Sequence, residues 1–191
     1  MSTLYGIDQR QGKTAGETGF EEMTAALSYW HNDGADRSRV DCLVLGKLLL
    51  LNERHQAIDP GRVEHERFLI TADARLDNRT SLARALELNQ PLQEISNDAM
   101  ILAAYQRWGE DCPRHLLGDF AFAIWDPVRR QLFCARDHVG VKPFYYHLAD
   151  DLCVFANDIR GVVAHPQVPE DYDPRMILSY LYEINQPEIT F

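Results

Sequence analysis

The residues of this sequence best suited to chemistry gather in one short segment, RDHVGVKP, at positions 136–143. Arg136 and Asp137 stand close to Gly140, Lys142 and Pro143. An arginine–aspartate pair can orient a loop, and Gly140 suits a backbone position that needs a positive φ. We interpret this segment as a strand–loop–strand corner with a structural or domain-docking role rather than a catalytic one.

Metal and disulfide chemistry are not indicated by the cysteines and histidines. The four cysteines, Cys42, Cys112, Cys134 and Cys153, lie far apart and form no CxxC pair, which argues against zinc and thioredoxin-like sites. The seven histidines show no i, i+3 or i+4 pairing, so we expect no metal site. Because Cys134 and Cys153 sit in apolar runs, we expect buried, reduced thiols in a cytoplasmic protein.

The overall charge excludes two classes of partner. The 191 residues carry 29 acidic and 19 basic side chains, a net charge of −10. This balance argues against binding to nucleic acid or to an anionic membrane surface. The N-terminal MSTLYGIDQR lacks the basic and apolar regions of a signal peptide, and no run approaches the ~18 apolar residues of a membrane span.

The elements that must position these residues follow from the hydrophobic pattern. In the first half we expect strands over 2–8, 40–53 and 68–76, the middle one being a strand pair or a strand broken at Gly46. Helical spacing predicts helices over 21–30, after Asn78, and over 97–108. The turn residues of HNDGADRSR, at 31–39, predict a loop.

Beyond Gly118 the pattern changes to the two-residue period of strands. DFAFAIWD, QLFCARD, PFYYHLA and DLCVFAND are four short runs with tight connections, which suggests an antiparallel meander. Helices are expected over 158–164 and 174–182. Antiparallel strands with helices between the strand groups predict an α+β layered sandwich. Residues 1–170 form the expected domain, and 171–191 a C-terminal helix and linker.

Four segments carry a resemblance to a known family. RDHVGVKPFYYH (136–147) resembles the RDxxGxKPLYY segment of asparagine synthetases and related class II glutamine amidotransferases. LLGDFAFAIWD (116–126) is similar to the family strand GMFAFALYD, and FANDIRGVVAHP (155–166) to FASEIKALLAHP. NDAMILAAYQRWGED (97–111) is similar to the helix SDxExILxAYxxWGE. All four lie in the family's order, so the chain is identified as a member.

The resemblance implies a fold and a larger context. The family fold is the N-terminal-nucleophile (Ntn) hydrolase-like four-layer αββα sandwich of two antiparallel sheets. In the family an ATP-using synthetase domain follows, and its SGGxDS loop does not occur in these residues. We therefore expect no cofactor in this chain, with ATP and Mg²⁺ used only by a synthetase domain on the same or a separate chain. The resemblance leaves open whether the chain forms a homodimer.

The resemblance also assigns the nucleophile and the oxyanion donors. The family start MCGIxGI aligns with Met1–Ile7, which places Ser2 at the cysteine nucleophile. A serine hydroxyl is far less ionised than a thiol, so Ser2 is either a weak nucleophile or a plain strand residue. The Asn-Gly oxyanion pair aligns with Ala72 and Asp73. Losing one such donor costs ~2.7–4 kcal/mol. We expect Asp73 at a strand end or turn, facing water.

Substrate capture is the remaining test of the resemblance. The family arginine that clamps the glutamine α-carboxylate aligns with Leu49, and Lys47 is a substitute without the bidentate fork. Asp98 matches the aspartate that binds the glutamine α-amine, although it also suits the first turn of a helix. Together these changes predict a degenerate pocket.

The sequence therefore supports three hypotheses. The leading one is a glutaminase-inactive domain of an ATP-dependent ligase that forms an amide, lactam or isopeptide bond, similar to β-lactam synthetases and lasso-peptide cyclases. The second is a working glutamine-hydrolysing asparagine synthetase domain that uses Ser2. The third is a free-standing interaction module for a synthetase partner chain.

Overall fold

The computed structural model describes residues 2–9, 17–30, 35–40, 42–48, 68–171 and 173–182. Leu49, the residue aligned with the substrate-binding arginine, lies outside these ranges.

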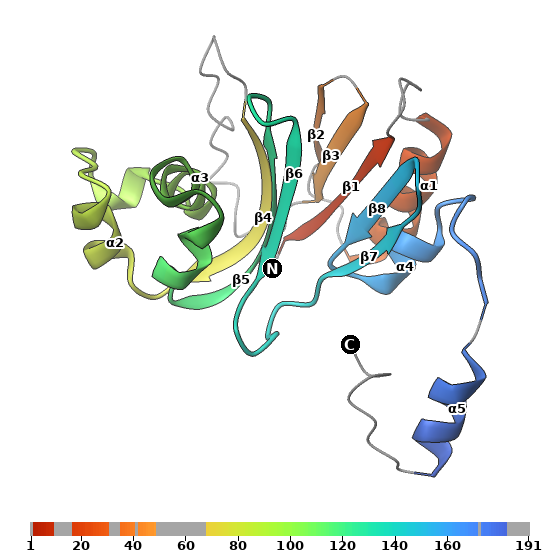
Figure 1. The fold of residues 1–191 in the computed structure, drawn as a ribbon. Helices are drawn as coiled ribbons and strands as arrows, with labels where there is room; N and C mark the ends of the chain where they lie inside the picture. Colours follow the sequence, from red (N-terminus) through yellow and green to blue (C-terminus); the bar gives the residue numbers. More distant parts are fainter. Residues whose placement is uncertain are drawn as a thin grey trace.

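Two antiparallel sheets face each other (Figure 1). The larger sheet has five strands in the order β2-β3-β1-β8-β7. They are β1 (Thr3–Gln9), β2 (Ala35–Val40), β3 (Leu43–Leu48), β7 (Tyr145–Leu148) and β8 (Leu152–Ala156).

The smaller sheet has three strands in the order β4-β5-β6, namely β4 (Leu69–Leu76), β5 (Gly118–Asp126) and β6 (Gln131–Arg136). Because five strands face three, the two sheets do not cover each other completely.

Helices form the outer layers. In the part of the chain that the structure describes, the α-helices are α1 (Glu17–Leu27), α2 (Arg79–Ala85), α3 (Asn97–Trp108), α4 (Ile159–Val163) and α5 (Pro174–Leu181). Helices α1 and α4 pack on the larger sheet, and α2 and α3 lie on the side of the smaller one, whereas α5 stands apart from both sheets (Figure 1). This helix–sheet–sheet–helix order confirms the predicted α+β sandwich. Short 3-10 helices cover Ser28–Trp30, Leu92–Glu94 and Gly109–His115.

The strands form here because their side chains supply both faces of a core. In β5 the large residues Phe120, Phe122 and Ile124 pack toward α3, while Ala121 and Ala123 face the other sheet. A strand buried on both faces reads as a nearly continuous apolar run, which is what GDFAFAIWD shows. The small alanines on the inner face let the two sheets approach.

Several element predictions need correction. Strand β2 occupies most of the segment 31–39, which was predicted as a loop. Its sequence, ADRSRV, forms an exposed edge strand and therefore lacks the alternation of apolar residues from which a strand is predicted. Strand β3 continues through Gly46 without a break, and helix α1 begins at Glu17 rather than at 21.

The four strands after Gly118 do not form one antiparallel meander, so this prediction is also wrong. Strands β5 and β6 pair in the smaller sheet, whereas β7 and β8 pair in the larger one. The loop over 137–144 carries the chain from one sheet to the other. Local alternation of apolar residues cannot reveal which sheet a strand joins.

The cysteine prediction is confirmed only in part. Cys112 is buried, and burial raises the pKa of its thiol to about 12. Cys134 is exposed and Cys153 is partly exposed, so the expected burial of these two is wrong. Cys134 lies on β6, the edge strand of the smaller sheet, where a neighbour is missing on one side. Within the described ranges, no helix is long and apolar enough to cross a membrane.

Candidate functional site

The candidate site surrounds Ser2, just before β1 begins. Ser2 is buried, and its backbone N–H donates to Asp73 Oδ1 at 3.4 Å. Its hydroxyl donates to the Ala72 carbonyl oxygen at 3.2 Å, and its own carbonyl accepts from Asn157 Nδ2 at 3.0 Å. The polar groups of Ser2 are thus held by neighbours from two sheets.

The alternation of β4 determines which side chains reach Ser2. Ile70 and Ala72 pack in the core beneath α3, whereas Thr71 faces the larger sheet, where its hydroxyl donates to the Gly46 carbonyl at 3.0 Å. Asp73 shares the Thr71 face. Ala72 therefore presents only its carbonyl to Ser2, and Asp73 presents its carboxylate.

The expectation that Asp73 faces water is wrong. Asp73 lies inside β4 rather than at its end, and only 5% of the residue is exposed. A carboxylate at this depth needs a cationic partner. Lys142 provides it, with its Nζ 2.7 Å from Asp73 Oδ2.

A second ion pair joins the larger sheet to α3. Lys47 Nζ on β3 lies 2.8 Å from Asp98 Oδ2, and both side chains are mostly buried. Asp98 is in the first turn of α3, as predicted, where the helix dipole favours an anion. The preceding Ser96 caps this helix by accepting from the Ala99 N–H at 3.0 Å.

The corner segment is organised around Asp137. Its carboxylate accepts from the backbone N–H groups of Val141 and Lys142, both at 2.8 Å. Burial acts to raise the pKa of this carboxyl, but the backbone N–H groups outweigh it and hold the pKa below its usual value.

The remaining corner residues have geometric roles. Gly140 has φ +71°, and a Cβ there would lie 3.0 Å from the Arg136 guanidinium. Arg136 therefore lies against Gly140, while the Asp137 carboxylate is held by loop N–H groups. Pro143 is exposed beside Lys142.

The structure places residues in contact that the sequence analysis had assigned to different parts of the molecule. Lys142 belongs to the corner motif yet reaches Asp73 of the pocket, and Asn157 was not anticipated as a neighbour of Ser2. Strand alternation in ITADARL gives a signal for an inward-facing Asp73. Nothing local signals the contacts of Lys142 and Asn157, because they join positions far apart in the chain.

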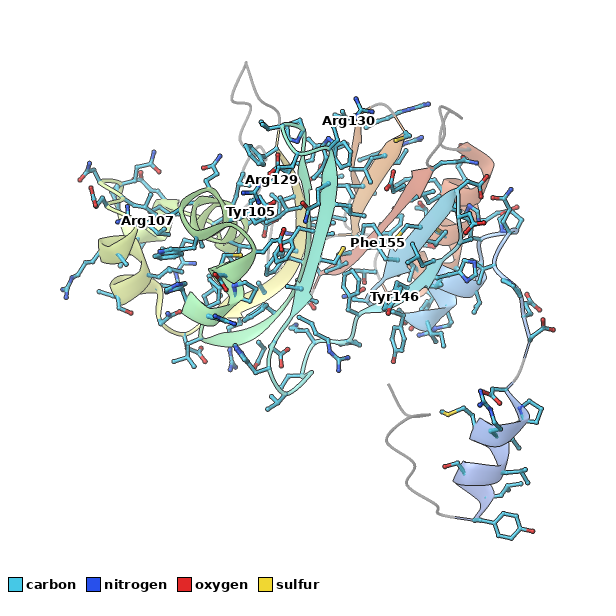
Figure 2. The ribbon with its side chains drawn as sticks, viewed as in Figure 1. Tyr105, Arg107, Arg129, Arg130, Tyr146 and Phe155 are labelled. Atoms are coloured by element: carbon cyan, nitrogen blue, oxygen red, sulfur yellow. The ribbon has the colours of Figure 1, made fainter. Side chains whose placement is uncertain are left out.

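Other hollows lie away from Ser2. One of about 380 Å³ is lined by residues that include Tyr105, Arg107 and Arg129, on the α3 side of the smaller sheet (Figure 2). Within the described ranges, no group of three or more His, Cys, Asp or Glu residues is arranged to hold a metal ion.

A solved structure identifies the fold class. The chain resembles the glutamine phosphoribosylpyrophosphate amidotransferase from Bacillus subtilis, complexed with ADP and GMP, with a TM-score of 0.66 and 15% identity. The match covers 83% of this chain and 42% of the other. The fold is therefore the Ntn-hydrolase-like αββα sandwich.

The sequence comparison identifies the family. Residues 1–191 match the glutamine amidotransferase domain family, and the chain belongs to it. Asparagine synthetase [glutamine-hydrolyzing] 3 of Bacillus subtilis is 36% identical over 107 residues, which is 56% of this chain and 17% of that protein. Asparagine synthetase [glutamine-hydrolyzing] 2 of the same organism is 25% identical over 114 residues, 60% of this chain and 15% of that protein. The matched part is less than a fifth of either relative.

Proposed function

We propose that this chain is the amidotransferase-like domain of an ATP-dependent, amide-bond-forming ligase related to asparagine synthetases, and that it does not hydrolyse glutamine. The family and its relatives support the first half of this proposal. The second half rests on the contacts around Ser2 and Asp98.

The observation that carries the proposal is the Lys47–Asp98 ion pair. In the family that the sequence resembles, the aligned aspartate binds the α-ammonium group of glutamine. Here the Lys47 ammonium lies 2.8 Å from the Asp98 carboxylate, within the distance of a charge-assisted hydrogen bond. Glutamine would have to displace this ammonium group in order to bind the Asp98 carboxylate.

The groups that would perform the chemistry are also engaged. The Ser2 hydroxyl donates its hydrogen to the Ala72 carbonyl oxygen, which is not a base that could take up the proton. At the aligned oxyanion position stands Asp73, a carboxylate already paired with Lys142. A carboxylate repels a developing oxyanion, whereas hydrolysis requires hydrogen-bond donors at that place.

The ligase context extends beyond this chain. We propose that residues 171–191 lead to a synthetase domain, on the same or a separate chain, and that this domain binds ATP and Mg²⁺. An acceptor amine supplied directly by the substrate would make glutamine hydrolysis unnecessary. β-Lactam synthetases and lasso-peptide cyclases, which the sequence resembles in lacking the N-terminal cysteine, fit this arrangement. A cytoplasmic location and a homodimer belong to the same proposal.

Ser2 as a working nucleophile is the rival function. It is favoured by the position of Ser2, which is buried beside Asp73 where the start of β1, the central strand of the larger sheet, meets β4 of the smaller sheet. In this case the Ser2 hydroxyl would attack the glutamine amide carbon, the C–N bond would break with release of ammonia, and water would hydrolyse the resulting ester to glutamate.

Covalent trapping separates the two functions. The intact protein is incubated with the electrophilic glutamine analogue 6-diazo-5-oxo-L-norleucine and analysed by mass spectrometry, beside a glutamine-hydrolysing asparagine synthetase as positive control. We expect no adduct on Ser2, and none on the Ser2→Cys variant, because Lys47 still occupies Asp98. An adduct on native Ser2 would establish the rival function.

A further inference from the structure

A histidine outside the Ser2 site is buried where helices α1 and α4 meet on the outer face of the larger sheet (Figure 1). His165 follows α4, and only 6% of the residue is exposed. Its neighbours in the chain, Val162 and Val168, pack in the apolar cluster beneath α1. Burial disfavours the charged form of an imidazole, and histidine is the side chain whose charge changes most readily near neutral pH.

The imidazole lies directly against the backbone of α1. A Cβ at Gly19 would lie 2.5 Å from both Cδ2 and Nε2 of His165. A second close contact joins the same helices, because a Cβ at Gly161 of α4 would lie 2.8 Å from Cδ1 of Leu27 in α1. With the ring this close to its backbone, α1 must move if the ring changes position.

A hydrogen bond determines where a proton could enter the ring. The backbone N–H of Gln167 donates to His165 Nδ1 at 3.3 Å. The neutral ring therefore carries its hydrogen on Nε2, and protonation would occur at Nδ1. Both nitrogens of a charged imidazole are donors, so the new N–H would face the N–H of Gln167 and the hydrogen bond would be lost.

Two ionisable side chains from neighbouring elements act on His165. They are Glu22 of α1 and His147 of β7, the strand that also contacts α4. In α4 itself, Asp158 and Arg160 bind each other at 2.8 Å. Burial lowers the pKa of the His165 imidazole, the Glu22 carboxylate acts to raise it, and His147 acts to lower it. The result is a pKa below the usual 6.5.

We infer that His165 is an acid-sensitive latch, which holds α1 against α4 while the imidazole is neutral and releases α1 when the imidazole is protonated. A base whose pKa is lowered in the docked state binds more protons once it is released. Docking is therefore at full strength above about pH 6.5 and weakens as the pH falls below this value. Release would uncover the cluster beneath α1, which includes Tyr5 and Ile7 of β1. The latch is separate from the Ser2 site and does not depend on the proposed function.

Hydrogen exchange of the backbone amides tests the latch. The intact protein is labelled at about pH 7.5 and about pH 5.5, with labelling times scaled to the intrinsic exchange rates, and analysed by mass spectrometry. At the lower pH the protection of α1 should fall about three- to tenfold, whereas α3, on the other side of the sandwich, should keep its protection.

Three variants identify the group that titrates. His165→Leu should abolish the difference in α1 protection between the two pH values. His147→Gln should reduce it, because a neighbour that repels the charged imidazole is removed. His138→Gln, which replaces an exposed histidine, should leave it unchanged.

The latch is overturned if α1 of the native protein is equally protected at both pH values, or if the difference persists in His165→Leu. Should that variant fail to fold, the native protein still decides. The midpoint at which the imidazole resonance of His165 shifts with pH should coincide with the midpoint of α1 release, and two separate midpoints would contradict the latch.

Discussion

Two lysines determine the character of the candidate site. Lys47 and Lys142 each place an ammonium group within 2.8 Å of a buried or largely buried aspartate. Pairs with this little exposure are screened less by solvent than surface pairs, and removing one partner leaves an uncompensated charge. Each pair therefore compensates the charge of an aspartate close to Ser2 or at the start of α3.

Replacing Lys47 should reopen the Asp98 position. We expect Lys47→Ala to lower the free energy of unfolding by about 1–2 kcal/mol, because the Asp98 carboxylate loses a partner at 2.8 Å. Millimolar n-propylammonium should then raise the melting temperature of the variant but not of the native protein. In the double variant Lys47→Ala/Asp98→Asn this rescue should vanish. Equal rescue of both variants would show that the amine acts elsewhere.

Asp137 should make stability depend on acid. Its folded-state pKa lies below the unfolded value of 3.8, so the ionised carboxylate stabilises the fold above that pH. This contribution is complete above about pH 5 and is lost as the pH falls through the folded pKa. Urea unfolding at a series of pH values should show the difference between native protein and Asp137→Asn shrinking below pH 3.8. A difference that stays constant down to pH 2 would contradict this role.

At the scale of single residues, the sequence predicted which residues lie at the site better than it predicted which residues they contact. The resemblance pointed to Ser2, Asp73 and Asp98, and the structure brings Ser2 and Asp73 into contact. The orientation of Asp73 was missed because the residue was assigned to a strand end, although the alternation of ITADARL, which places Asp73 inside β4, signals an inward-facing side chain. The role of Lys142 was missed because its partner is far away in the chain.

Among the elements, the junction between β4 and β5 is the most constrained. Gly118 begins β5 with φ +132°, and a Cβ there would lie 2.0 Å from the Arg75 carbonyl oxygen. The obstacle is backbone within a paired strand, so it cannot move aside without disturbing β4.

Gly118→Ala should therefore be among the more damaging single substitutions. We expect a loss of at least about 2 kcal/mol in the free energy of unfolding, measured by urea titration. Gly140→Ala is the matched control, since φ is again positive but the neighbour is the flexible end of Arg136. It should cost only about 1 kcal/mol. Equal losses at the two positions would show that backbone conformation, rather than the Arg75 contact, limits both.

Element types were predictable where the periodicity was strong. Helix α3 was predicted with the bounds that the structure has, because Ser96 caps it and its apolar residues recur regularly. Strand β2 was missed because a polar edge strand lacks an apolar face. The division of the four later strands between two sheets depends on the crossing loop, whose path is fixed by tertiary contacts of Asp137 and Lys142.

At the scale of the whole molecule, the scaffold and the pocket have separate origins of stability. The three apolar clusters lie between α3 and the smaller sheet, between the sheets, and between the larger sheet and α1. Of the candidate site residues, Ala72 belongs to the first cluster, whereas Ser2, Asp73 and Asp98 belong to none of the three. This separation is what we propose for the chain: its fold is kept by the apolar clusters after the glutamine chemistry has been lost.

The release of glutamate from L-glutamine by the intact protein tests this account most directly. It should be measured for the native protein and for Ser2→Ala, because a contaminating glutaminase would be insensitive to that substitution. The account predicts that both preparations release glutamate only at the rate of the buffer blank. Steady release by the native protein that disappears in Ser2→Ala would contradict it.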